Sequence, residues 1–187
     1  MLTNAEQGWM LLLFVAVNFA IAGLGSRLGE RGHGSEVWFE SLKKPPGYPS
    51  PTFFSQVWTL VAIATGVAGW LIWSYMVSGG GITALALYGF QLLMLATWQG
   101  ETIGLRRLRW GMTVGGVLLA IVTLTMLAAL PVPGWAWCWL VPLWLLVAWG
   151  LRLNAALYRL NYGPAPTPPQ AAPQPPPPTE PAQPPQP

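Results

Sequence analysis

Two long stretches without a charged side chain constrain the fold of this chain more than any other feature. Residues 45–100 and residues 110–151 contain no Asp, Glu, Lys, Arg or His. Soluble domains carry roughly 25% charged residues, whereas this chain has 8%. Uncharged apolar stretches of about 20 residues or more are typical of membrane spans. The sequence therefore predicts an integral membrane protein.

Helix-breaking residues divide these stretches into segments of the length that a span requires. About 20 apolar residues cross a hydrocarbon core of roughly 30 Å. Ser78-Gly79-Gly80-Gly81 interrupts the first stretch, and Pro131-Val132-Pro133-Gly134 interrupts the second. Together with an apolar segment near the N-terminus, this pattern predicts an all-α membrane protein. We expect a five-transmembrane-helix bundle with spans at residues 9–25, 53–77, 82–100, 110–130 and 135–158.

The positions of Lys and Arg predict the orientation of the spans. Residues 1–8 contain Glu6 but no Lys or Arg, so we expect a retained first span and not a signal peptide. All nine Lys and Arg lie between spans one and two, between spans three and four, or near the end of span five. Positive residues favour the cytoplasmic side. We therefore expect the N-terminus outside and the C-terminus inside, in a bacterial cytoplasmic membrane.

The remaining side chains argue against several classes of function. Cys138 and His33 are the single cysteine and the single histidine, so the sequence offers no disulfide framework and no Cys/His metal cluster. It also offers no carboxylate pair and no nucleophile paired with a base. Membrane topology explains the excess of Lys and Arg over Asp and Glu. This excess therefore does not indicate a nucleic-acid partner. We expect a binding protein without a cofactor or metal, and not an enzyme.

The C-terminal segment differs in composition from the rest of the chain. Residues 163–187 are rich in Pro and Gln and contain one charge, at Glu180. Such a segment cannot bury a core, so we expect a disordered, extended tail. The tail acts as a solvated spacer in one interpretation. In the other, the chain is an accessory membrane protein that recruits partners through it.

Twelve tryptophans are the most unusual part of the composition. Tryptophan collects at membrane interfaces, which accounts for those at span ends, such as Trp9, Trp73 and Trp135. Four others lie farther from the helix breakers or recur within a span, so interface belts explain them less well. Flat rings on neighbouring helices can line a pocket for a flat ligand or simply pack between helices. These two interpretations apply to Trp58, Trp98, Trp144 and Trp149.

A proline-rich loop leads into the second span. Four prolines within residues 45–51 fix φ and hold the preceding residues extended, so the loop is stiff. We refer to residues 43–50 as the strap. It is either a rigid connector or a lid. As a lid, it offers Tyr48 and Phe53 for apolar contact and Lys43 or Lys44 for an acidic group on a ligand.

Three blocks of residues stand out between positions 38 and 161. The first block is Trp38-Phe39, Leu42, Lys44-Pro45, Pro49, Phe54 and Val57-Trp58-Thr59. The second is Gln91-Leu92, Met94, Trp98 and Gly104, followed by Trp110. The third is Pro142, Leu153-Asn154 and Arg159-Leu160-Asn161. In content and order these blocks resemble the TspO/MBR family, which comprises tryptophan-rich sensory proteins and translocator proteins.

This resemblance implies a five-helix bundle whose pocket lies under the first loop. It also implies a receptor or carrier for porphyrins, other tetrapyrroles or sterol-like lipids, with light-dependent porphyrin degradation as the alternative. Leu95 and Leu146 stand where the family has Asn and Trp, and Trp144 and Trp149 are available to supply missing rings. The ligand-binding residues that we predict, including the strap residues Lys44 and Tyr48, are Trp38, Lys44, Tyr48, Phe54, Trp58, Gln91, Trp98, Trp110, Trp144 and Trp149.

The expected partners are membrane lipids and a hydrophobic small molecule such as a porphyrin. Gly111 and Gly115 form a GxxxG step, which allows close approach of two helices. The step serves either packing within the bundle or a homodimer.

Overall fold

A computed structural model of the chain describes residues 4–30, 34–77 and 81–163. All regular structure in these ranges is helical, and five helices are long and apolar enough to cross a membrane. This confirms the predicted all-α membrane fold. Apart from Gly163, the predicted tail lies outside the described residues. The five helices are α1 (Asn4–Glu30), α3 (Pro51–Val77), α4 (Ile82–Gln99), α5 (Leu108–Ala128) and α6 (Ala136–Tyr162).

Some helices are longer than the apolar segments that predict them. Helix α1 continues beyond residue 25 to Glu30, and α6 continues beyond residue 158 to Tyr162. Hydropathy marks where a segment leaves lipid, but helical hydrogen bonds continue outside the membrane. Two short elements have no hydropathy signature and were not predicted: the helix α2 (Ser35–Ser41) and the π-helical turn η1 (Gly100–Gly104).

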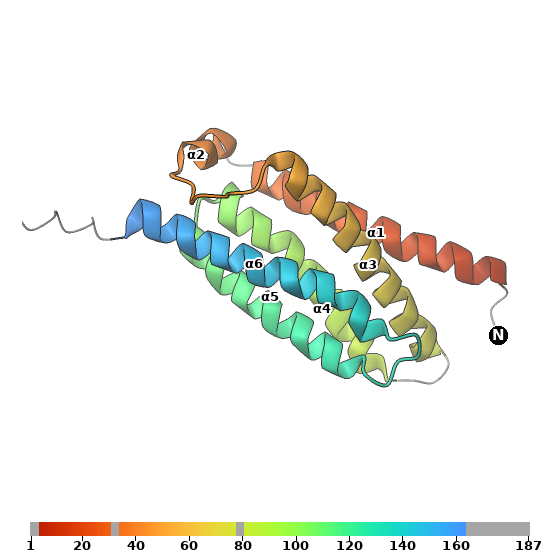
Figure 1. Cartoon of the computed structure of the whole chain (residues 1–187). Coiled ribbons are helices and arrows are strands. Elements are labelled where there is room, and N and C mark those ends of the chain that lie inside the picture. Colours follow the sequence, from red (N-terminus) through yellow and green to blue (C-terminus); the bar gives the residue numbers. More distant parts are fainter. Residues whose placement is uncertain (1–3, 31–33, 78–80, 164–187) are drawn as a thin grey trace, which may run out of the picture.

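The helices form a closed ring in the order α1, α3, α6, α5 and α4. Each packs against the next, and α4 packs against α1. Figure 1 shows α2 and the strap at one end of this bundle, beside the C-terminal end of α6. The α5–α6 turn lies at the other end. The strap end carries most of the described positive side chains, including Arg27, Lys43, Lys44, Arg106, Arg107, Arg109 and Arg159.

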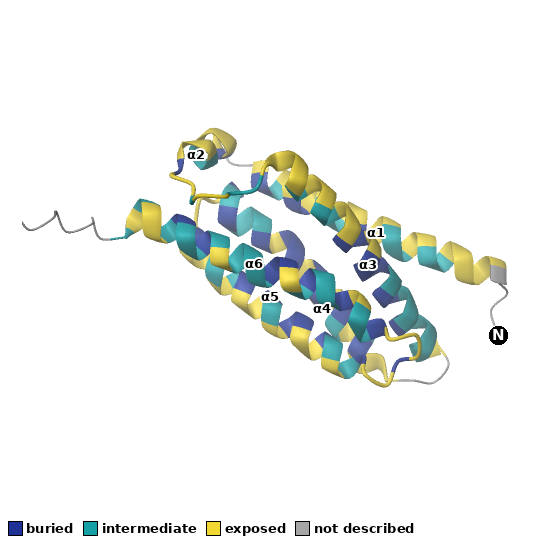
Figure 2. Ribbon diagram, in the orientation of Figure 1, coloured by how far each residue is buried: buried dark blue, intermediate teal, exposed yellow. Residues whose placement is uncertain are grey.

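Helix α1 is the most peripheral of the five spans. Only 11% of its most apolar window is buried, compared with 33% to 44% in the other four. Figure 2 shows this as long exposed and half-buried faces along the helix. A polar contact ties α1 to the bundle: Asn18 Nδ2 donates to the hydroxyl of Tyr88 (2.7 Å), which donates to the carbonyl of Thr65 (3.2 Å). Helices α1, α4 and α3 therefore meet at one buried hydrogen-bonded point.

Glycines allow α3 to approach both neighbours closely at this level. A methyl group built on Gly66 would lie 2.7 Å from Val15 Cα, and one on Gly69 would overlap the ring of Tyr88. Small residues at helix contacts are typical of membrane bundles, where packing replaces the hydrophobic effect as the main attraction between helices. The tyrosine ring thus occupies the space that Gly69 leaves open.

The glycines of the predicted GxxxG step face the interior of the same chain. A methyl group on Gly111 would overlap the side chain of Thr102, and one on Gly115 would lie 2.7 Å from Leu151 and 2.8 Å from Trp98 Nε1. Both glycines serve packing of α5 within the bundle. The homodimer stays a prediction, and this step no longer supports it.

Candidate ligand-binding site

The strap crosses the end of the bundle between α2 and α3 (Figure 1). Its prolines lack backbone donors and hold it extended. Gly47 has a positive φ of 74°, and the amide of Tyr48 donates to the carbonyl of Pro45 (3.1 Å), which closes a turn. Immediately before the strap, Leu42 is buried with Leu108 of α5 and Leu157 of α6. The loop is therefore anchored at its start and bent in its middle.

Four aromatic rings form a continuous row that includes Tyr48 of the strap. We define this aromatic row as Phe39, Tyr48, Phe54 and Trp149. The ring centroids of Phe39 and Tyr48 are 6.4 Å apart, as are those of Tyr48 and Phe54. Phe54 of α3 and Trp149 of α6 stack, with centroids 5.4 Å apart and an interplanar angle of 26°. The row joins α2, the strap, α3 and α6.

Further rings extend the row at both ends. Trp38 contacts Phe39, with centroids 6.4 Å apart, and Phe53 packs edge-on against Trp149 at 6.3 Å. Phe39 is absent from the predicted ligand-binding residues, although it lies in the first family block beside Trp38. Phe53 is expected only as an apolar contact that a lid would offer. Closeness in sequence to Trp38 and Phe54 is the signal that points to these two residues.

A positive charge lies over the outer part of the row. Lys44 Nζ is 5.7 Å from the ring centroid of Phe39 and 5.7 Å from that of Tyr48, within range of cation–π attraction. Burial raises the pKa of the Tyr48 phenol above its usual value of 10.0. The tyrosine is therefore neutral at physiological pH. The row presents apolar ring faces and one ammonium group.

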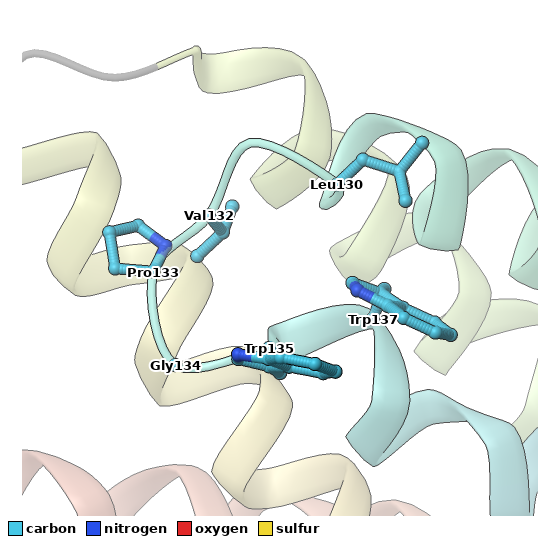
Figure 3. Close-up of a pocket in the computed structure, with 6 residues that line it drawn as sticks. All are labelled: Leu130, Val132, Pro133, Gly134, Trp135 and Trp137. Atoms are coloured by element: carbon cyan, nitrogen blue, oxygen red, sulfur yellow. The ribbon is translucent and has the colours of Figure 1, made fainter.

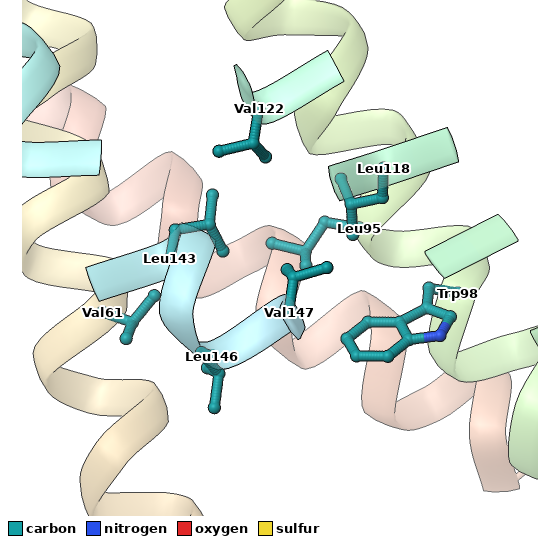
Figure 4. Packing of buried hydrophobic residues seen from close by; sticks show 8 residues of the cluster. All are labelled: Val61, Leu95, Trp98, Leu118, Val122, Leu143, Leu146 and Val147. Atoms are coloured by element: carbon teal, nitrogen blue, oxygen red, sulfur yellow. The ribbon is translucent and has the colours of Figure 1, made fainter. Parts of the chain in front are cut away.

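Trp98 lies deeper, in the main buried cluster between α4, α5 and α6 (Figure 4). Its side chain is 7% exposed, and Nε1 has no hydrogen-bond partner among the described residues. Glycines on two other helices provide its space: a methyl on Gly115 would lie 2.8 Å from Nε1, and one on Gly150 would lie 2.5 Å from Cη2. The indole is thus wedged between α5 and α6. Trp58 of α3 is half-buried against the same cluster.

Aliphatic side chains fill the rest of this cluster. Leu95, Leu143, Leu146 and Val147 are all buried there, and Figure 4 shows them together with Trp98, which lies at one side of the group. Two of them occupy the positions at which the family carries Asn and Trp. The interior consequently has fewer polar and aromatic groups than the family pattern implies.

Gln91 is fully buried on α4, with an exposed fraction of 0%. Neither Oε1 nor Nε2 has a hydrogen-bond partner among the described residues. Leaving buried polar groups unpaired costs about 1–3 kcal/mol each. Gln91 therefore carries a donor and an acceptor that none of the described residues uses.

Two further predicted residues, Trp110 and Trp144, also lie outside the aromatic row. Trp110 is 59% exposed on α5, so its ring faces outward and not into the bundle. Trp144 is half-buried on α6, and its Nε1 donates to Thr123 Oγ1 on α5 (3.0 Å). The contact of Trp144 joins two helices. The structure thus brings five of the predicted residues together at the strap: Trp38, Lys44, Tyr48, Phe54 and Trp149. The buried cluster below contains Trp98 and is contacted by Trp58. Gln91 is buried on α4.

Two hollows occur elsewhere on the molecule. One of about 340 Å³ lies at the α5–α6 turn and is lined by Leu130, Val132, Pro133, Gly134, Trp135 and Trp137 (Figure 3). The other, of about 270 Å³, lies between α1 and α4 and is lined mainly by apolar side chains. Neither contains a predicted site residue. The Trp-lined pocket beneath the strap therefore stays a prediction, based on the aromatic row.

Comparisons with known proteins agree with the sequence blocks. A profile of the TspO/MBR family matches residues 12–159. The translocator protein of Ovis aries is 30% identical over 139 residues, which cover 71% of this chain and 79% of that protein. The translocator protein of Bos taurus is 30% identical over 156 residues, which cover 78% of this chain and 89% of that protein. Protein CrtK of Rhodobacter capsulatus is 28% identical over 138 residues, which cover 70% of this chain and 82% of that protein.

The match to the family extends from α1 into the last turn of α6 and so includes every span, the strap and the aromatic row. The five-helix fold agrees with the one that the resemblance implies. This integral, multi-pass membrane protein belongs to the TspO/MBR family.

Proposed function

We propose that the protein is a membrane receptor or carrier that binds a planar hydrophobic ligand at the aromatic row. Its relatives include two that are named translocator protein. The ligand is a tetrapyrrole such as a porphyrin, with a sterol-like lipid as the other candidate. The proposal requires binding and release but no catalytic group and no resident cofactor.

The observation that carries this proposal is the stack of Phe54 on Trp149. The two rings belong to different spans, and they are close to parallel at 26°. Stacked aromatic contacts contribute about 0.5–1.5 kcal/mol beyond the burial of their area. A flat guest that inserts here replaces one ring–ring contact with two ring–guest contacts. Flat shape is therefore the property that this pair recognises best.

The charge above the row favours a tetrapyrrole over a sterol. Lys44 lies beside Tyr48 at the exposed edge of the row, where it can pair with the carboxylate of a porphyrin side chain. A sterol has no anionic group for this lysine. The apolar ring system of either ligand suits the faces of Phe54 and Trp149.

Binding of protoporphyrin to the purified protein tests the proposal. The porphyrin's own absorbance is the better signal, because twelve tryptophans make fluorescence quenching difficult to assign. We expect saturable binding that Trp149→Leu weakens by about tenfold, which corresponds to about 1.4 kcal/mol. Trp139→Leu is the matched control, since Trp139 lies on the same helix and is 44% exposed. Absence of saturable binding, or equal dissociation constants for the two variants, would overturn the proposal.

We also propose that the strap end of the bundle faces the cytoplasm and that the protein resides in a bacterial cytoplasmic membrane. The support is the positive side chains, including Lys43 and Arg107, that gather at this end. In this orientation the aromatic row opens toward the cytoplasmic leaflet, and the α5–α6 turn lies outside.

A further inference from the structure

One amide side chain joins the strap to the last turn of α6. The Oδ1 of Asn161 accepts a hydrogen bond from the backbone N–H of Lys43 (2.9 Å). Its Nδ2 donates to the backbone carbonyl of the same lysine (3.0 Å). A single side chain thus satisfies both backbone groups of Lys43, although 118 residues separate the two in sequence. The sequence alone gives no sign of this contact.

The orientation of the Asn161 amide is fixed by its own helix. Nδ2 also donates to the carbonyl of Leu157, one turn earlier (2.8 Å). A primary amide has two N–H donors, and both are used here. The side chain therefore has little freedom to rotate away from the strap, and the contact is held from the α6 side.

The position of Lys43 explains why the contact matters for the strap. Lys43 follows the buried Leu42 and precedes Lys44-Pro45-Pro46. The two prolines have no N–H to donate, so only Lys43 and Lys44 keep both backbone groups in this part of the strap. Of these two, Lys43 exchanges a pair of hydrogen bonds with Asn161. The same helix that carries Asn161 carries Trp149, so α6 contributes both to the row and to the attachment of its cover.

We propose that Asn161 is a latch that holds the strap closed over the aromatic row and thereby slows ligand release. Asn161 is a positioning residue, because its side chain acts through hydrogen bonds to the strap backbone. The effect on ligand release depends on the proposed function, whereas the effect on the strap itself does not.

Hydrogen exchange of the ligand-free protein tests the latch without any ligand. The purified full chain and its Asn161→Ala variant are compared over the peptide that contains Lys43 and Tyr48. Both backbone groups of Lys43 lose their partner in this variant, so we expect exchange at Lys43 that is about tenfold faster or more. Leu160→Ala is the matched control, since Leu160 lies in the same turn and is 47% exposed. We expect this control to exchange like the unmodified protein.

A second variant distinguishes loss of the Asn161 hydrogen bonds from a general loss of structure. Asn161→Asp keeps an oxygen that can accept from the Lys43 N–H but loses both donors. We expect its exchange rate to lie between those of the unmodified protein and Asn161→Ala, with helix content unchanged in all variants. Exchange at Lys43 that is the same in Asn161→Ala and in the unmodified protein would overturn the latch.

Dissociation of protoporphyrin separates a latch from a passive contact. We expect Asn161→Ala to raise the dissociation rate by about tenfold and to change the association rate far less, because an open strap mainly lets the guest leave. Faster exchange at Lys43 with an unchanged dissociation rate would overturn the role in ligand release. If no variant binds protoporphyrin, the proposed function fails, while the exchange data still decide whether Asn161 holds the strap.

Discussion

At the scale of single residues, Trp98 shows how the interior of the bundle is packed. The indole takes the space that Gly115 and Gly150 leave open, and Leu95 and Leu146 belong to the same buried cluster. A side chain at Gly150 would meet the ring, so its absence allows the ring to lie between α5 and α6. The ring is therefore a packing element of the interior as well as a candidate contact for a guest.

Gly150→Ala tests whether the ring depends on this space. The new methyl would lie 2.5 Å from Trp98 Cη2, so the indole has to shift. Overpacking of this kind costs about 1–3 kcal/mol. We expect a lower midpoint of thermal unfolding in detergent. Gly116→Ala is the control, because a methyl there meets no atom within 4 Å. Equal midpoints for the two variants would contradict the proposed packing.

The candidate site residues were chosen from the sequence, but the sequence does not show which of them lie together in space. The family blocks indicate Trp38, Lys44, Phe54 and Trp110 alike. The structure brings the first three to the strap end and leaves Trp110 59% exposed. The spans are apolar on all sides, because lipid is as apolar as leucine, so periodicity does not mark the inward face. Contacts between distant residues, such as Asn161 with Lys43, leave no local signal at all.

At the scale of helices, the attachment of α1 depends on a polar contact within the membrane. The hydroxyl of Tyr88 accepts from Asn18 and donates to the Thr65 carbonyl. Asn18 is 4% exposed although most of its helix is not buried. Helices in lipid gain little from apolar contact with one another, so such hydrogen bonds contribute a larger share of the attraction.

Tyr88→Phe removes this hydroxyl and keeps the ring that fills the space at Gly69. We expect a loss of about 1 kcal/mol in the free energy of unfolding, with faster hydrogen exchange in α1 than in α5. Tyr162→Phe is a matched control, because Tyr162 is 53% exposed at the end of α6. If α1 exchanges at the same rate in both variants, the contact does not hold the helix.

The spans themselves follow from the sequence with little error. Charge-free stretches of sufficient length must form helices in lipid, since each backbone group needs an internal partner there. The short helix α2 and the π-helical turn η1 depend instead on local packing. In η1, for example, Gly104 lies directly against the carbonyl of Leu28, and Thr102 Oγ1 donates to the carbonyl of Trp98 (2.7 Å). Hydropathy contains no information on such contacts.

At the scale of the whole molecule, the bundle has one positive end and one nearly uncharged end. The strap, the aromatic row and the latch all lie at the positive end, together with Arg106 and Arg107. The turn that contains Trp135 lies at the opposite end. In the orientation that we propose, the candidate site lies in the cytoplasmic half of the membrane.

Cysteine labelling tests this orientation in a Cys138→Ser background. Gly81 precedes α4 at the uncharged end, and Thr52 lies at the start of α3 at the strap end, and both are exposed. With a membrane-impermeant maleimide on intact cells, we expect Gly81→Cys to be labelled at once and Thr52→Cys only after lysis. The reverse pattern would place the strap outside.

The central claim is that a flat hydrophobic guest binds at the aromatic row, between the rings of Phe54 on α3 and Trp149 on α6. Photo-crosslinking with a diazirine-bearing protoporphyrin, followed by peptide mapping, tests it most directly. The account predicts labels on peptides that contain Tyr48, Phe54 or Trp149, and their loss when unlabelled protoporphyrin is in excess. Competed labels found only in the α5–α6 turn at Trp135 and Trp137, or on the outer face at Trp110, would contradict it.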